Sequence, residues 1–223
     1  HHVTRVLRLA VGDRIRVFDA GAEFEATLTS VSKRGVAVNV GEAVRAAAER
    51  PVALHLIMSP LKGDLTELVI QKATELGVAR VSPVVFERTD TVARRDPSEA
   101  RVSRWHRVAV SAAEQSGRAV VPELDGVQPI EKLLEALGAL DGDEARIVAA
   151  EPSLGLPIEE ARPEAHLRRV RVAVGPAGGF GPRDLELLGR AGFRAESFAL
   201  HTLRAETACL AALSILGARF AGS

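Results

Sequence analysis

The sequence predicts an α/β protein in which helices cover a parallel sheet, with a smaller β domain preceding it. Three observations point to this class. Residues 1–50 contain short stretches of alternating polar and apolar residues separated by turns. From Val52 onward, apolar strand patterns alternate with helix patterns, which is typical of a parallel sheet. Apolar residues make up 47% of the 223 residues, which is enough for a sizeable core.

The N-terminal region is expected to form short strands joined by tight turns. Alternation predicts strands at Arg14–Phe18, Glu23–Val31 and Gly35–Val40, with turns at Asp19–Gly21 and Ser32–Gly35. Such a pattern favours a small barrel. An alanine-rich, charged link over Glu42–Arg50 follows, so two domains are expected, residues 1–50 and residues 51–223.

The second domain is expected to alternate strands and helices. The strands are Val52–Met58, Ala79–Phe86 (interrupted by Pro83), Arg146–Ala150, Arg169–Val174 and Ala195–Leu200. The helices are Asp64–Leu76, Ser98–Ser116, Ile130–Leu137, Pro182–Ala191 and Ala205–Phe220. Asp64 and Glu67 have the spacing of a capping box, and Gly77 is a typical helix end.

Composition excludes several classes of protein. The formal net charge is zero, so total charge gives no argument for a polyanionic partner. The longest apolar stretch, 208–218, is shorter than the roughly 18 residues that a membrane span needs. A single cysteine, Cys209, and the lack of a secretory pattern predict a cytoplasmic location without disulfides. The six histidines show no metal-ligand spacing, so no metal is expected.

A glycine-rich loop is the most informative local feature. The stretch RVAVGPAGGFGPRDLELLGRAGF (171–193) places Gly175, Gly178, Gly179 and Gly181 between an apolar strand and a helix opened by Pro182. Loops at the carboxyl ends of parallel strands are where open α/β sheets bind ligands. The spacing fits neither a dinucleotide fingerprint nor a phosphate loop. It suits a flat, largely uncharged ligand such as an adenosine, although glycines in a purely structural turn are the alternative reading.

The closing segment FALHTLRAETACLAALSILGARF (198–220) places two charges, Arg204 and Glu206, where the last helix begins. A capping acid and a surface arginine would explain these residue types as well as a catalytic pair would.

Several separated motifs, in chain order, resemble one known family. They are HHVTRVLRLAVGDRIRVFD (1–19), MSPLKGDLTELVIQKATELGVARVSPVVFER (58–88), RWHRVAVSAAEQSGRAVVPEL (104–124), VGPAGGF (174–180) and LRAETA (203–208). Together they resemble the RsmE family of 16S rRNA (uracil-N3) methyltransferases in the SPOUT superfamily. Two positions depart from the family pattern: Ala177 stands where the family usually has glutamate, and His201 stands where it usually has arginine.

The resemblance implies a SPOUT-type parallel sheet with a C-terminal trefoil knot, preceded by a PUA-like β-barrel, in a homodimer. It implies S-adenosylmethionine as cofactor and methylation of uracil N3 at a single uridine, U1498, of 16S rRNA in the 30S subunit. Two alternatives remain open: an RNA-binding relative with weakened activity because of Ala177 and His201, and a SPOUT methyltransferase that modifies another RNA position.

The resemblance also assigns candidate site residues. The catalytic candidates are Arg204, which would stabilise charge on the base, and Glu206, which would accept a proton or orient Arg204. The cofactor candidates are Ala150, Glu151, Gly175, Pro176, Ala177, Gly178, Gly179, Leu200, His201, Thr202, Leu203 and Ala208. The RNA candidates are His2, Arg5, Arg8, Arg88, Arg94, Arg95 and Arg118, for which surface ion pairs are the alternative explanation.

Overall fold

A computed structural model describes residues 8–19, 21–32, 35–44, 49, 51–91, 99–151 and 166–220. The chain divides into two compact units, one of residues 1–48 with 117–120 and one of residues 49–116 with 121–223. The RNA candidates His2, Arg5, Arg94 and Arg95 lie outside the described residues.

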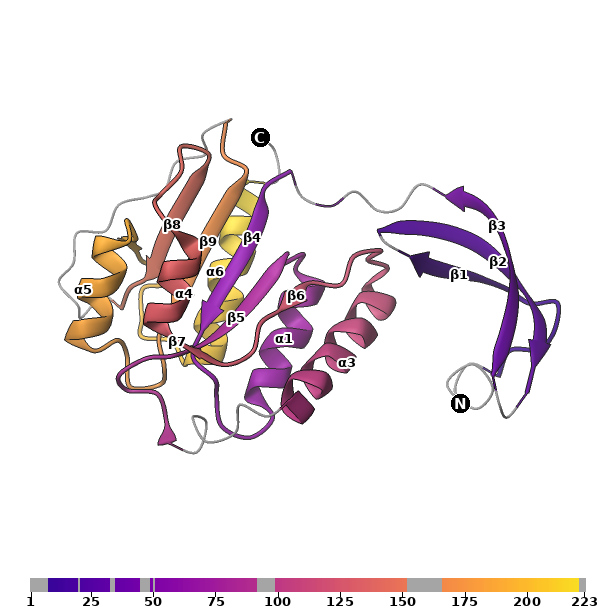
Figure 1. Cartoon of the computed structure of the whole chain (residues 1–223), viewed down its shortest axis with the longest axis horizontal. Helices are drawn as coiled ribbons and strands as arrows, with labels where there is room; N and C mark the ends of the chain where they lie inside the picture. Colours follow the sequence, from indigo (N-terminus) through magenta and orange to yellow (C-terminus); the bar gives the residue numbers. More distant parts are fainter. Residues whose placement is uncertain are drawn as a thin grey trace. The chain divides into compact units, whose positions relative to one another are not determined.

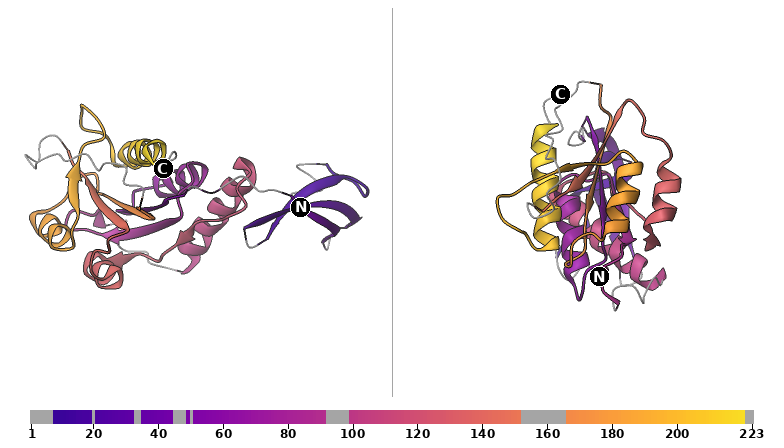
Figure 2. Two further views of the ribbon diagram at one scale, coloured as in Figure 1. Left: turned by 90° about the horizontal axis from the view of Figure 1, so that it is seen from above. Right: turned by 90° about the vertical axis from the view of Figure 1, so that its left-hand side faces the viewer.

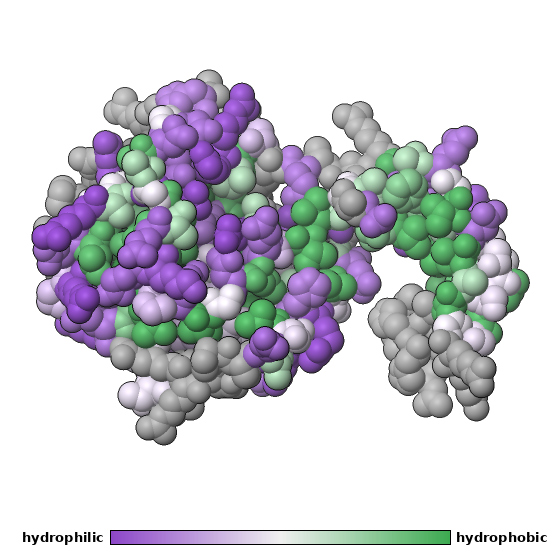
Figure 3. All heavy atoms as spheres, in the orientation of Figure 1, coloured by the Kyte–Doolittle hydropathy of each residue, from purple (hydrophilic) through white to green (hydrophobic). Residues whose placement is uncertain are grey.

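The first unit contains a three-stranded antiparallel sheet with the order β1-β2-β3 in its described part. The strands are β1 (Arg14–Asp19), β2 (Ala22–Val31) and β3 (Val36–Val44), so the last one runs into the segment expected to be a link. Ala26 and Leu28 of β2 are buried. Many hydrophobic side chains lie on the visible face of these strands (Figure 3), and Val40 is 51% exposed.

The second unit is built on a parallel sheet. Its described strands have the order β10-β8-β9-β4-β5-β6, and β7 also pairs with β5. Their bounds are β4 (Ala53–Met58), β5 (Arg80–Val85), β6 (Glu123–Leu124), β7 (Gln128–Pro129), β8 (Glu144–Ala149), β9 (Arg169–Val174) and β10 (Arg194–Glu196). Every pairing in this sheet is parallel, as the alternating strand and helix patterns predict.

Helices cover both faces of this sheet (Figures 1 and 2). The first face carries α1 (Leu65–Glu75), α3 (Glu99–Ser116) and α6 (Ala205–Arg219), and the second carries α4 (Ile130–Leu137) and α5 (Pro182–Arg190). Side chains alternate along β4 accordingly, with Leu54, Leu56 and Met58 in the core under the first group and Ile57 in the core under the second. The sequence pattern of a doubly covered sheet is therefore confirmed.

Two side chains with possible reactive or stacking roles are part of the first core. Trp105 is 1% exposed and Cys209 is 1% exposed. Burial also raises the pKa of the Cys209 thiol, which keeps it protonated and unreactive. Both residues therefore act in packing, as the surrounding apolar pattern indicates.

Three local expectations are wrong in detail. Asp64 makes no side-chain cap on α1, because its carboxylate instead accepts a hydrogen bond from Arg104 at 3.3 Å. The strand expected to reach Leu200 ends at Glu196, so the following residues form a loop. Pro83 does not interrupt β5, which continues from Arg80 to Val85. Proline has no N–H to donate to a neighbouring strand, and pairing along this side of β5 is interrupted around Pro83. The short strand β6 pairs with Arg80–Val81 before it, and β7 pairs with Val84–Val85 after it.

A row of polar side chains lies across the amino-terminal part of the sheet. This polar row consists of His55, Ser82, Asp125, Arg171 and Glu144. Arg171 Nη1 lies 2.8 Å from His55 Nδ1, and His55 Nε2 lies 2.6 Å from Ser82 Oγ. Because a guanidinium only donates, His55 Nδ1 accepts and Nε2 carries the proton that Ser82 accepts. Ser82 in turn donates to Asp125.

Charge and burial set the protonation states of the polar row. Burial, assisted by Arg171 and Arg80, lowers the pKa of His55 to about 3, so the imidazole is neutral at pH 7. Burial opposes ionisation of Glu144, but hydrogen bonds from Arg171 and Arg146 outweigh it and lower the pKa of that carboxyl. Arg171 holds Glu144 through Nε at 2.8 Å and Nη2 at 3.0 Å. The charges of this row are thus paired inside the fold.

Candidate cofactor-binding site

A pocket lies at the carboxyl ends of β8 and β9, as expected for a ligand site in an open α/β sheet. Its volume is about 320 Å³. Three backbone segments and the first turns of α6 form its walls. The lining residues are Arg88, Ala149, Ala150, Glu151, Val174, Gly175, Pro176, Ala177, Gly178, Gly179, Phe180, Ser197, Phe198, Ala199, His201, Thr202, Leu203, Ala205 and Ala208.

The glycines of the loop serve two different purposes. A Cβ on Gly175 would lie 3.1 Å from the ring of Phe180, which packs edge-on against Phe86 with ring centroids 5.1 Å apart. Gly179 has a φ of +71° in a turn closed by its own N–H and the carbonyl of Pro176 at 2.8 Å. Gly175 therefore admits a core side chain, and Gly179 allows the loop to turn back along the pocket wall.

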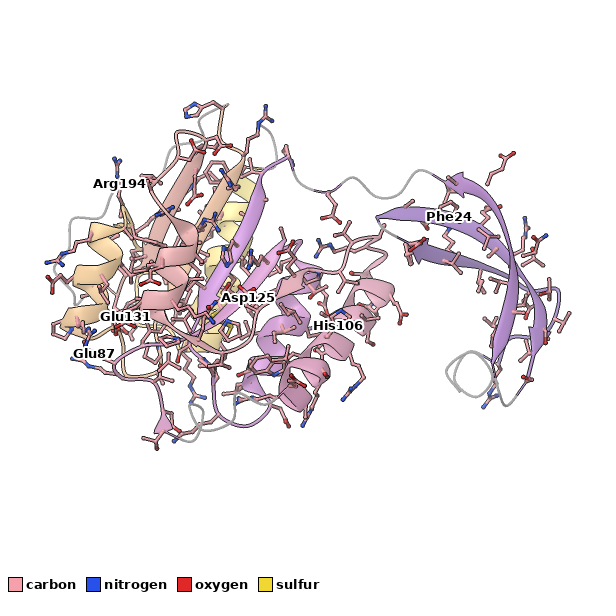
Figure 4. The ribbon with its side chains drawn as sticks, in the orientation of Figure 1. Phe24, Glu87, His106, Asp125, Glu131 and Arg194 are labelled. Atoms are coloured by element: carbon pink, nitrogen blue, oxygen red, sulfur yellow. The ribbon has the colours of Figure 1, made fainter. Side chains whose placement is uncertain are left out.

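The far end of the glycine loop is fastened to the end of β5. The Asp184 carboxylate accepts hydrogen bonds from the N–H of Gly181 at 2.8 Å and from the N–H of Glu87 at 3.1 Å. The Glu87 carboxylate accepts one from the N–H of Arg183 at 3.0 Å. We call the reciprocal contacts of Glu87, Gly181, Arg183 and Asp184 the latch; Glu87 is labelled in Figure 4. A Cβ on Gly181 would overlap the Glu87 carboxylate, so the latch requires glycine there.

The position of Asp184 removes its carboxyl group from water. The residue is 1% exposed, and burial raises the pKa of its carboxyl, with the nearby Glu87 charge adding to the shift. The hydrogen bonds from Gly181 and Glu87 act in the opposite direction. The latch thus combines an unfavourable buried carboxyl with the backbone donors that stabilise it, as at other helix N-termini.

Charged side chains are few in the pocket wall. Arg88 is exposed, and its Nη1 donates to the carbonyl of Gly178 at 3.0 Å. A Cβ on Gly179 would lie 3.5 Å from Glu151 Oε1 and 4.0 Å from Arg88 Nη1. A guanidinium and a carboxylate therefore both approach the same turn of the glycine loop.

Most of the cofactor candidates from the sequence lie around this one pocket. They are Ala150, Glu151, Gly175, Pro176, Ala177, Gly178, Gly179, His201, Thr202, Leu203 and Ala208. Leu200 is the exception, because it is 92% exposed and is not part of the lining. Ala177 and His201, the two departures from the family pattern, are both exposed at the wall.

The catalytic candidates lie next to the pocket without lining it. Arg204 occupies the N-cap position of α6, and Glu206 lies in the first turn. The residues on either side of Arg204, Leu203 and Ala205, do line the pocket. The exposed Arg204 guanidinium has no hydrogen bond or ion pair with any residue that the structure describes. The guanidinium is therefore exposed, next in the chain to two residues of the pocket lining.

The described RNA candidates differ in their surroundings. Arg8 is exposed in the first unit with a φ of +53°. Arg118 is buried to 9% exposure. Arg88 lines the pocket.

Sequence reasoning missed the pocket residues Ser197, Phe198 and Phe180 and the latch partner Glu87. For Glu87, the available signal was its place just after β5, because all parallel strands end at the same edge of the sheet and a polar residue there can reach the ligand loops.

The pocket suits an adenosine-containing cofactor such as S-adenosylmethionine. Its volume falls at the small end of the usual range for ligand pockets, about 300–1,000 Å³. Most of its wall is backbone and small side chains, against which a flat purine can lie closely. Among the described residues, no group of three or more His, Cys, Asp or Glu side chains is placed to hold a metal ion. Within the same residues, no helix has the length and apolar character needed to cross a bilayer.

Comparisons with known proteins agree with this geometry. Residues 48–217 match the model of an RNA methyltransferase domain, and residues 1–41 match that of an RNA methyltransferase PUA domain. Ribosomal RNA small subunit methyltransferase E of Bacillus subtilis is 31% identical, over 97% of this chain and 86% of that protein. The protein of the same name from Synechocystis is 30% identical, over 98% of this chain and 70% of that protein.

Solved structures give the same result. The Neisseria gonorrhoeae ribosomal RNA small subunit methyltransferase E bound to S-adenosylmethionine has a TM-score of 0.80 at 29% identity, over 97% of this chain and 87% of that one. A putative methyltransferase of Legionella pneumophila, in complex with the same cofactor, has a TM-score of 0.80 at 30% identity and the same coverage. The chain therefore belongs to the RNA methyltransferase family that includes the ribosomal RNA small subunit methyltransferases E.

Proposed function

We propose that this protein methylates uracil N3 at a single uridine of 16S rRNA, using S-adenosylmethionine. The nucleotide is U1498 and the substrate is the assembled 30S subunit. The observation that carries the proposal is the pocket at the ends of β8 and β9, where three backbone segments leave room for an adenosine beside the start of α6. The cofactor-bound relatives with the same fold support this reading.

The residues of the pocket wall have distinct roles in this proposal. The turns around Gly178 and Thr202 hold the nucleoside through backbone groups, and Glu151 faces the glycine turn. S-adenosylmethionine supplies a methyl group already activated by a positively charged sulfur, so no metal is required. Phe198 and Val174 add apolar side chains to the lining, which would help to exclude water around a bound cofactor.

Arg204 is proposed to act on the acceptor base. Uracil N3 carries a proton at neutral pH and is a poor nucleophile until that proton leaves. Negative charge then spreads to O2 and O4, where the Arg204 guanidinium can donate charge-assisted hydrogen bonds. Glu206, one turn into α6, accepts the proton or orients Arg204. N3 forms its bond to the methyl carbon as the bond from that carbon to sulfur breaks, which leaves S-adenosylhomocysteine.

The remaining features of the proposal concern assembly and RNA contact. The first unit forms a PUA-like barrel that binds RNA through His2, Arg5 and Arg8, with Arg118 contributing from the same unit and Arg94 and Arg95 from the second unit. The boundary between the two domains in the sequence falls after residue 50, the C-terminal segment forms a trefoil knot, and two chains form a cytoplasmic dimer. The family membership supports these features, because two models matched along the chain are those of RNA-modifying domains.

Methyl transfer to 30S subunits tests the function directly. Subunits are taken from a bacterial strain that lacks its own enzyme for this position and are incubated with the protein and methyl-labelled S-adenosylmethionine. Nuclease digestion and mass spectrometry should find one N3-methyluridine per subunit, at U1498. Subunits that already carry the modification are the matched control and should accept no label. Label at another nucleotide would mean that the protein modifies a different position. If the unmodified subunits accept no label, the proposed function is rejected.

A further inference from the structure

We infer that Arg88 binds the carboxylate of the methionine moiety and so belongs to the cofactor pocket, an inference that rests on the proposed function. Sequence reasoning places Arg88 among the RNA contacts, beside Arg94 and Arg95. The structure places its side chain in the pocket wall, on the carbonyl of Gly178.

The position of the guanidinium is fixed from both ends. Its stem lies over Gly178, whose Cβ, if present, would be 3.5 Å from Arg88 Cβ and 3.7 Å from Arg88 Cδ. Its Nη1 donates to the Gly178 carbonyl at 3.0 Å. The backbone just before it is held by the latch, through the N–H of Glu87 on Asp184. Arg88 is therefore positioned over the glycine loop before any ligand arrives, which reduces the entropy lost on binding.

The charges at this corner complement an amino-acid head group. Arg88 is the one permanent cation among the described lining residues, and the carboxylate is the only anionic group of S-adenosylmethionine. Apart from the bond to Gly178, the guanidinium N–H groups have no hydrogen-bond partner among the described residues. Glu151 Oε1 approaches the same Gly179 turn, where it can face the ammonium group on the same carbon. A neighbouring guanidinium and carboxylate are what a zwitterion requires.

An RNA phosphate is the competing anion for Arg88. A phosphate contact made by an unanchored surface arginine would leave the side chain extended into solvent. Here the guanidinium is turned onto the loop that lines the cavity, so an anion that meets it lies at the pocket mouth. The head group of the cofactor is the anion that the proposed function brings there.

The test compares two ligands that differ in one group. Binding of S-adenosylmethionine and of decarboxylated S-adenosylmethionine is measured by titration calorimetry on the whole protein. The proteins are wild type, Arg88→Ala, Arg88→Lys and the control Arg190→Ala, which removes an exposed arginine of α5. Arg88→Ala should weaken S-adenosylmethionine binding by about tenfold or more and leave the decarboxylated ligand within about twofold. Arg88→Lys should restore part of the difference, and the control should match wild type.

Three results would overturn the inference. Equal weakening of both ligands would mean that Arg88 only supports the loop, and unchanged affinity for both would mean that it does not contact the head group. Loss of 30S binding with normal affinity for S-adenosylmethionine would assign Arg88 to the RNA. Wild-type protein that binds neither ligand would instead reject the proposed function itself.

Discussion

Glu87 and Asp184 are 97 positions apart in the sequence, yet the main-chain N–H of Glu87 donates to both carboxylate oxygens of Asp184 at 3.1 Å. This contact joins the segment after β5 to the first turn of α5, the helix that follows the glycine loop. The glycine loop is consequently held at its C-terminal end, where Gly181 leads into α5. Cofactor binding and stability of the fold should therefore both depend on the latch.

Replacement of Asp184 by alanine should destabilise the protein and weaken cofactor binding. The N–H groups of Glu87 and Gly181 would lose their acceptor in a buried place, which costs about 1–3 kcal/mol of unfolding free energy. Urea denaturation and calorimetry with S-adenosylmethionine measure the two effects. Glu186→Ala, in the same helix, removes only an exposed ion pair with Arg190 and should change stability by less than about 0.5 kcal/mol. Equal effects of the two variants would contradict a role for the latch.

A pair of glycine substitutions in the same segment should have opposite effects. An alanine at Gly181 would displace the Glu87 carboxylate, at a cost of about 1–3 kcal/mol. At Gly189, inside α5, nothing lies within 4 Å of the added Cβ, so alanine should stabilise the helix by up to about 1 kcal/mol. Thermal denaturation of both variants gives the comparison. Destabilisation by Gly189→Ala would show that the two positions do not differ as the contacts require.

Acid should destabilise the protein in part through His55. The pKa of this residue falls from 6.5 when unfolded to about 3 when folded, so the unfolded chain binds more protons between those values. Stability from this group is complete above pH 6.5 and declines as the pH falls, by up to about 1.4 kcal/mol per pH unit. In urea denaturation between pH 7 and pH 4, the unfolding free energy of His55→Gln should fall less steeply with decreasing pH than that of the wild type. The exposed His106 is the matched control, and His106→Gln should keep the wild-type slope.

Arg204→Ala should reduce methyl transfer more than cofactor binding. Removal of a donor that acts mainly in the transition state lowers turnover by about 10²–10³-fold. Arg204 does not line the pocket, so the dissociation constant for S-adenosylmethionine should change little. Single-turnover assays on 30S subunits and calorimetry separate the two quantities. Equal losses in rate and affinity would argue for a structural role at the start of α6.

Local pattern was sufficient for most of the fold. The strand β9 has the bounds expected from its apolar run, because Gly175 stops it cleanly, and α5 begins at Pro182 as the proline position indicates. The pattern failed at β10, where Ala195–Leu200 is apolar enough for a strand. Phe198 and Ala199 instead line the pocket, and apolar character alone does not distinguish strand pairing from a cavity wall.

Long-range polar contacts could not be predicted. Asp184 reads locally as an acid in a first helical turn, and nothing near it in the sequence indicates Glu87. His55, Ser82 and Glu144 occur in different strands, and their pairing depends on strand order and register. The glycine loop could be found from the sequence pattern, since strand ends share one edge of a parallel sheet, whereas the other pocket residues were assigned from the family resemblance.

The interruption of strand pairing around Pro83 affects whether a strand from another chain can add to this edge of the sheet. Because β6 and β7 are each two residues long and β7 ends in Pro129, this margin of the sheet offers few main-chain groups for an incoming strand. The described strand at the opposite margin, β10, has three residues. The sheet of the second unit, bordered in this way, is therefore a poor template for strand addition at these two margins.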